Sequence, residues 1–170
     1  MKNGNYIFCG HLGITSAIIC TNANGEVLWN ETYGENGEYS YFHAMRETNG
    51  GIIAAGYKNI NGNRNGWVVK VNFAGEIIWV REHRGGNGRR YSDMVSYEDG
   101  FYLGGYSNAG TFTKINDNGN ETFHDSYDNF NFCYGIQKLS MNGAVLVGVT
   151  NNLEYPCALR VNAEGVEIWN

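Results

Sequence analysis

The chain has 170 residues, which is enough for one domain with a core of its own. Hydrophobic residues make up 42% and charged residues 17%, so the chain is globular rather than disordered. The net charge of −5, a pI near 5.3 and the lack of a basic tail argue against a nucleic-acid partner. The printed chain has neither an apolar run of membrane-spanning length nor the apolar core of a signal peptide, so we predict no membrane partner.

Turn-forming residues dominate the composition. The chain has 24 Gly, Asn is equally frequent, and there is a single Pro. Gly and Asn tolerate a positive φ angle, which tight turns between strands require. The 12 Tyr, 8 Phe and 4 Trp residues add side chains that strands favour. This composition predicts an all-β fold.

Two sequence phrases recur four times. The first phrase reads TNANGEVLWN, VNFAGEIIWV, INDNGNETFH and VNAEGVEIWN, and its glycines, which we call the turn glycines, are Gly25, Gly75, Gly119 and Gly165. The second phrase ends on its own series of glycines, Gly10, Gly56, Gly105 and Gly148. Both series recur at intervals of 43 to 50 residues. A period of this length with several β-segments per unit is typical of propeller blades.

The second repeat shows the expected unit most clearly. We predict strands over 41–48, 51–58, 67–72 and 76–83, with 59–66 as a polar loop and 84–90 as the crossing to the next unit. Four antiparallel strands in a meander make one blade. The whole chain, 1–170, then forms a single β-propeller-like domain of four repeats, approximately 1–34, 35–84, 85–128 and 129–170.

The first repeat begins with the segment that corresponds to the second strand of the other repeats, so the first blade lacks its inner strand. We therefore expect fifteen strands. The missing strand has three explanations, which the sequence leaves open. The chain is an excerpt of a longer propeller, or its ring closes imperfectly, or a second copy completes it as a homo-oligomer.

Each unit needs a large anchor, because one sheet alone cannot bury both of its faces. The aromatic residue four positions after each turn glycine fits this role. We therefore predict that these four residues dock on the adjacent sheet: Trp29, Trp79, Phe123 and Trp169.

The Gly-x-x-x-Trp pattern resembles the tryptophan-docking motif of quinoprotein-like β-propellers. Paired with the second phrase, it looks even more like the propeller repeats of bacterial and archaeal cell-surface proteins. The resemblance covers nearly the whole chain and implies a scaffold fold with an extracellular or cell-envelope location. Quinone-dependent dehydrogenases of this superfold use adjacent cysteines and acidic calcium ligands. No two cysteines are adjacent here, so that activity is not carried over.

The inner strands of a propeller line its axis, and the mouth of this channel is the usual ligand site. Tyr and Asn side chains in number, with few charges, suit sugar hydroxyl groups. The candidate ligand-binding residues on the inner strands are Tyr41, His43, Arg46, Tyr91, Asp93, Tyr97, Tyr134 and Gln137.

One crossing between units is basic, while its counterparts are acidic. We expect it to be a solvated loop, or to bind an anion, or to meet an acidic crossing of another copy. Its residues are Arg81, Arg84, Arg89 and Arg90.

The sequence contains no pattern of residues that is typical of a catalytic or metal site. It has no HExxH motif, no G-x-S-x-G elbow and no metal-type spacing of its four cysteines, so we predict no metal and no cofactor. His83 and His124 are expected to lie far apart on outer strands. The prediction is a non-catalytic binding or assembly scaffold; the alternatives are a carbohydrate-binding lectin, or a hydrolase or lyase with its site at the channel mouth.

Overall fold

The computed structural model describes residues 4–35, 37–85, 88–140, 143–150 and 155–169. These residues form fifteen strands and no helix. In chain order the strands are β1 (Tyr6–Leu12), β2 (Thr15–Thr21), β3 (Val27–Tyr33), β4 (Ser40–Thr48), β5 (Gly51–Ile60), β6 (Asn63–Val71), β7 (Ile77–His83), β8 (Arg90–Tyr97), β9 (Gly100–Tyr106), β10 (Gly110–Asn116), β11 (Glu121–Tyr127), β12 (Phe130–Lys138), β13 (Ala144–Thr150), β14 (Pro156–Val161) and β15 (Glu167–Trp169).

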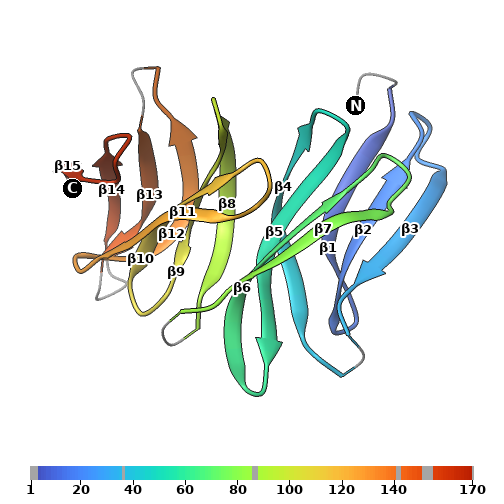
Figure 1. The fold of residues 1–170 in the computed structure, drawn as a ribbon, viewed down its shortest axis with the longest axis horizontal. Coiled ribbons are helices and arrows are strands. Elements are labelled where there is room, and N and C mark those ends of the chain that lie inside the picture. Colours follow the sequence, from blue (N-terminus) through green and yellow to red (C-terminus); the bar gives the residue numbers. More distant parts are fainter. Residues whose placement is uncertain (1–3, 36, 86–87, 141–142, 151–154, 170) are drawn as a thin grey trace.

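The strands form four antiparallel meanders. Sheet 1 is β1–β2–β3, sheet 2 is β4–β5–β6–β7, sheet 3 is β8–β9–β10–β11 and sheet 4 is β12–β13–β14–β15. The all-β fold, the fifteen strands and the missing fourth strand of the first sheet are confirmed. The sheets follow one another in an open arc, with sheet 1 and sheet 4 at opposite ends of the long axis, so the described residues do not close into a ring (Figure 1).

One segment differs from its prediction. Residues 59–66 are not a polar loop, because β5 and β6 continue through them and meet at a two-residue turn, Asn61–Gly62. Both turn residues have positive φ, 51° and 82°, as in the turn that matches the twist of a hairpin. Polar residues read as a loop in the sequence, but a hairpin that projects beyond the core buries few of its side chains and does not need apolar ones.

Apolar side chains fill the three spaces between successive sheets. Ile18 and Tyr33 of sheet 1 pack with Ile52, Val69 and other residues of sheet 2. A second cluster joins sheets 2 and 3, and a third joins sheets 3 and 4. Each of the two middle sheets therefore has both faces covered, whereas the end sheets each have one.

The turn before the last strand of each sheet has the same hydrogen bonds in all four repeats. In sheet 2, the Asn72 side-chain oxygen accepts the backbone N–H groups of Ala74 and Glu76, at 2.9 and 3.0 Å. Gly75 has φ +87° and donates its N–H to the Asn72 carbonyl. Asn22, Asn116 and Asn162 form the same turn. Asn thus caps the turn and Gly supplies its positive φ.

An aromatic ring of each sheet lies on the turn glycine of the next sheet. A Cβ placed on Gly75 would lie 3.1 Å from the Trp29 ring, and a Cβ on Gly119 would lie 2.5 Å from the Trp79 ring. Phe123 covers Gly165 in the same way. A side chain at these glycines would therefore displace the ring, and we call this arrangement the ring-on-glycine contact.

A hydrogen bond accompanies each ring-on-glycine contact. Tyr33 donates its hydroxyl to the carbonyl of Gly75 at 2.8 Å, and Tyr127 donates to that of Gly165 at 2.6 Å. His83 Nε2 lies 2.9 Å from the carbonyl of Gly119. The first and last repeats lack the contact: Gly25 is exposed with open space beside it, and Trp169 is 45% exposed.

Gly119→Ala and Gly25→Ala form a matched pair that isolates this contact. Both replacements place a Cβ at positive φ, which costs about 1–2 kcal/mol. Only the Cβ at position 119 meets an indole, and overpacking adds about 1–3 kcal/mol. Urea unfolding in dilute solution should show the larger loss of unfolding free energy for Gly119→Ala. Equal losses would contradict the structural role of the contact.

Candidate functional site

Two of the predicted ligand-binding residues lie in an aromatic cluster at the start of β4. The Tyr41 ring is 4.4 Å from the His11 ring, 5.2 Å from the Tyr57 ring and 6.5 Å from the His43 ring, measured between centroids. His43 and Tyr57 are stacked at 5.8 Å. The guanidinium of Arg64 lies 5.2 Å from the Tyr57 centroid, where a cation–π interaction is favourable.

A second cluster surrounds Arg90 at the start of β8. Its guanidinium carbon lies 4.4 Å from the Phe132 ring and 5.3 Å from the Tyr106 ring. The Tyr106 and Phe132 rings stack at 4.4 Å, and Tyr134 stacks on Phe132 at 6.1 Å. Stacking on planar rings suits the delocalised, weakly hydrated guanidinium.

The two clusters form one surface, because β8, which carries Arg90, packs against β4, β5 and β6 of sheet 2. Burial, followed by repulsion from Arg64, lowers the pKa of Arg90. Burial, Arg90 and His11 lower the pKa of His43. We call this surface the aromatic–arginine band; its residues come from all four sheets and are His11, Tyr41, His43, Tyr57, Arg64, Arg90, Tyr106, Phe132 and Tyr134.

Two residues of the band lie at β-bulges, one in β4 and one in β12. The pairing of β4 with β5 shifts between Phe42 and Ala44, and that of β12 with β13 shifts between Cys133 and Gly135. The extra residues are His43 and Tyr134, and both are exposed. A bulge inserts one unpaired residue and redirects its side chain, which is a common device beside binding sites.

Sequence reasoning did not select five residues of the band: His11, Tyr57, Arg64, Tyr106 and Phe132. Tyr57 and Tyr106 lie near the ends of the second strands of their sheets, and Arg64 lies near the start of a third strand. The signal available in the sequence is the aromatic residue that directly follows the repeat glycines Gly56 and Gly105. The first strand of a meander starts where the second strand ends, so these residues reach the same edge as Tyr41 and Arg90.

The remaining predicted ligand residues lie away from the band. Tyr91 is completely buried, so it is a core residue and is not available to a ligand. Arg46 and Asp93 pair across sheets 2 and 3 at 3.2 Å. Tyr97 stacks on Tyr102 at 4.3 Å. Gln137 is exposed on β12.

The four arginines of the basic crossing have different surroundings. Arg81 lies over the Trp79 ring and donates from Nε to the Asn120 side chain at 3.1 Å. Arg84 is exposed. Arg89 is buried and pairs with Glu121 of the same chain, so its charge is not free for an anion or another copy. Among the four, only Arg90 belongs to the aromatic–arginine band.

An acidic crossing is also neutralised within the chain. The amine of Lys58 is buried beside Glu38 at 2.8 Å, Glu82 at 3.7 Å and Glu35 at 3.8 Å. Burial alone lowers the pKa of this amine, but the hydrogen bond and charge of Glu38, with the charges of Glu35 and Glu82, outweigh it and raise the pKa. Several charges of the acidic and basic crossings are therefore paired within the chain, and these charges are not free to meet an anion or another copy.

His83 and His124 lie near each other rather than far apart, because His83 contributes to lowering the pKa of His124, and Arg89 and Glu121 act on the pKa values of both histidines. Tyr91 and Gly119 bond the two nitrogens of His83, at 2.7 and 2.9 Å. Because a carbonyl only accepts, Nε2 donates to Gly119, and the neutral Nδ1 accepts from the Tyr91 hydroxyl. His124 Nδ1 bonds the Thr113 hydroxyl at 2.7 Å. This polar cluster joins sheets 2 and 3.

Among the described residues, no group of three or more His, Cys, Asp and Glu side chains is placed to hold a metal ion. All four cysteines are free thiols. The same ranges contain no helix that is long and apolar enough to cross a membrane.

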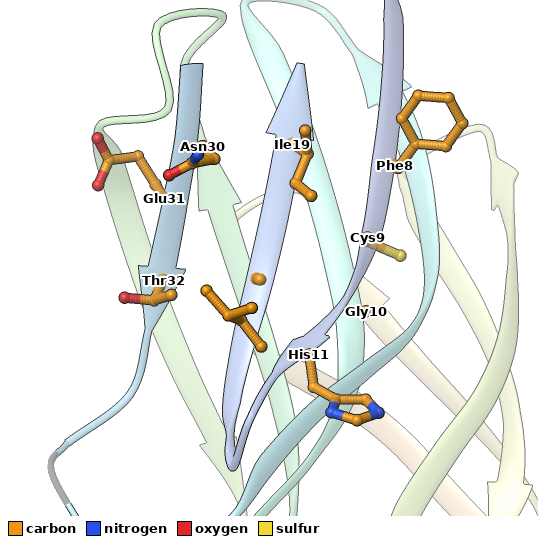
Figure 2. A pocket seen from close by; sticks show the side chains of 10 residues that line it. Phe8, Cys9, Gly10, His11, Ile19, Asn30, Glu31 and Thr32 are labelled. Carbon is orange, nitrogen blue, oxygen red and sulfur yellow. The ribbon is translucent and has the colours of Figure 1, made fainter. Parts of the chain in front are cut away.

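A hollow of about 310 Å³ lies on the outer face of sheet 1 (Figure 2). Phe8 of β1, Ile19 of β2 and Asn30 of β3 form one row across it, since Phe8 pairs with Ile19 and Ile19 with Asn30. Its lining is predominantly apolar and includes Leu12 and Ala17. The hollow is separate from most of the aromatic–arginine band, sharing only His11 with it.

Neither a protein-family model nor a curated protein matches the chain.

The pKa of His124 predicts how stability changes with pH. Burial, with the charge of Arg89, lowers this pKa from 6.5 to about 4. Between these values the unfolded chain binds the proton more readily than the folded protein does, so the contribution of His124 to stability is complete above pH 6.5 and is lost as pH falls through 4. Urea unfolding at stepped pH should show this decline, with a shallower slope for His124→Gln. An unchanged slope in the variant would assign the decline to other groups.

Proposed function

We propose that the chain is a non-catalytic binding scaffold built from consecutive blades of a β-propeller, and that the aromatic–arginine band is its ligand surface. The observation that carries the proposal is the position of Arg90 against aromatic rings, with no carboxylate paired to it among the described residues. Two basic groups buried near this edge, Lys58 and Arg89, are both neutralised. A positive group left without a counter-charge favours an anionic ligand.

The propeller interpretation is supported by four meanders of one period that pack face to face through the same contact. In sheets 2 and 3, the turn between the second and third strands lies at the same end of the strands as the connection to the next sheet. These turns and connections therefore form one edge of the arc. The band lies along this edge, where ligands of radial β-architectures are commonly bound. The resemblance to propeller repeats of cell-surface proteins is in keeping with a scaffold of this kind and with an extracellular or envelope location.

Acidic glycans are the ligand class that the band fits best, which makes a lectin the second candidate. Exposed rings such as Tyr134, which is 63% exposed, offer flat faces to the C–H groups of a sugar ring. The guanidinium groups of Arg64 and Arg90 can bind a carboxylate or sulfate in bidentate geometry.

The hydrolase or lyase alternative requires an acid or base held by an oppositely charged partner. The charged groups that act on His43 are Arg90 and His11, which are basic. They disfavour the imidazolium form without orienting the ring as a carboxylate would. The band therefore suits binding better than proton transfer.

A glycan array with neutral, carboxylated and sulfated members tests the ligand class. We expect binding to acidic members, and we expect Arg90→Gln to reduce it by about tenfold or more because the bidentate contact is lost. Arg84→Gln is the matched control, since Arg84 is exposed and outside the band. Binding to no acidic glycan, or equal reduction by both variants, would contradict the proposal.

A further inference from the structure

The arc has two outer faces, one on sheet 1 and one on sheet 4. The faces that correspond to them in the other sheets are buried between sheets. Tyr6, Phe8 and Ile19 on sheet 1 are 56%, 55% and 38% exposed. Their counterparts in sheet 2 are Ile52, Ala54 and Val69, which are buried against sheet 1 at 2% exposure or less. The outer face of sheet 1 thus has the composition of an inter-sheet face and lacks the sheet that would cover it.

Sheet 4 presents the opposite half of the same interface. Its outer row consists of Val145, Arg160 and Trp169, which pair successively across β13, β14 and β15. These three residues border a second hollow, of about 280 Å³. The corresponding row of sheet 2 is Ile53, Lys70 and Trp79, which faces sheet 3. Sheet 4 therefore carries the ring of a ring-on-glycine contact, Trp169, but no glycine of the described part of the chain lies beneath it.

Hydrogen bonds between neighbouring sheets show which polar groups an interface between the outer faces of sheet 1 and sheet 4 would pair. Trp29 Nε1 donates to the Phe73 carbonyl at 3.1 Å, and Lys114 Nζ donates to the Ala163 carbonyl at 2.7 Å. Both acceptors occupy the position after the turn Asn of the following sheet. The outer faces carry the corresponding groups. On sheet 4, Trp169 and Arg160 are the donors. On sheet 1, the Ala23 carbonyl is the acceptor and follows the turn Asn, two positions before Gly25.

We propose that a second copy of the chain covers both faces: sheet 4 of each copy docks on sheet 1 of the other, with Trp169 on Gly25. The interface is heterologous, because different surfaces meet, and such contacts form rings when their rotation closes. Two copies bring eight sheets together, which is the upper end of the usual range of blades in a propeller. This pairing uses surfaces other than the band, so it goes beyond the proposed binding function and can fail without it.

Sedimentation velocity at tens of micromolar tests the pairing. We expect wild type to sediment as a dimer, with twice the chain mass of 18.9 kDa. Trp169→Ala removes the docking ring, and because that side chain is exposed, the fold should remain intact. Gly25→Asn fills the place beneath the ring, and Asn tolerates the positive φ of 85° at this position. Each variant alone should be a monomer.

Mixing the two variants distinguishes this interface from any other. The intact Trp169 of Gly25→Asn can dock on the intact Gly25 of Trp169→Ala, so the mixture should again contain dimers. Ile78→Ser is the matched control, since Ile78 is an equally exposed apolar residue of sheet 2, and it should remain dimeric. A monomeric wild type, a dimer that survives both variants, or a mixture without dimers would overturn the proposal.

Discussion

The arrangement of the molecule depends on one contact, in which a ring of each sheet covers a turn glycine of the next. Because each contact pairs different surfaces, it gives the series of sheets a direction. Trp29, Trp79 and Phe123 form the contact, and a hydroxyl or imidazole four residues later bonds the carbonyl of the same glycine. The positive φ of the glycine and the absence of its side chain are both required, so the turn and the packing constrain the same residue.

The distribution of charge follows from this packing. Where sheets meet, Lys58 and Arg89 are buried and paired with carboxylates of the same chain, as buried charges must be. Arg90 lies one position further along, on the opposite side of the strand, and stacks on aromatic rings instead. Neighbouring arginines thus serve different purposes: one stabilises the junction of two sheets, and the other remains chemically available.

The architecture was readable from the sequence because its determinants are local. The period, the Asn-x-x-Gly turns and the count of strands depend on residues close together in the chain. The site was less readable because its determinants are not local. Tyr91 is buried because a bulge in β8 breaks the alternation, and the pairing of Arg89 with Glu121 joins residues that only folding brings together. The extension of β5 and β6 to Asn61–Gly62 was missed since polar hairpins resemble loops.

Coverage on both faces makes the middle of the arc differ from its ends. In a linear array each unit is stabilised by its immediate neighbours, and an end unit has one neighbour where a middle unit has two. In a single copy of the chain, backbone amides of β5, β6, β9 and β10 should therefore exchange their protons through the rarest openings, while those of β1 and β15 exchange through frequent fraying. The molecule would then unfold from its extremities inward, with the junction of sheets 2 and 3 as the last part to open.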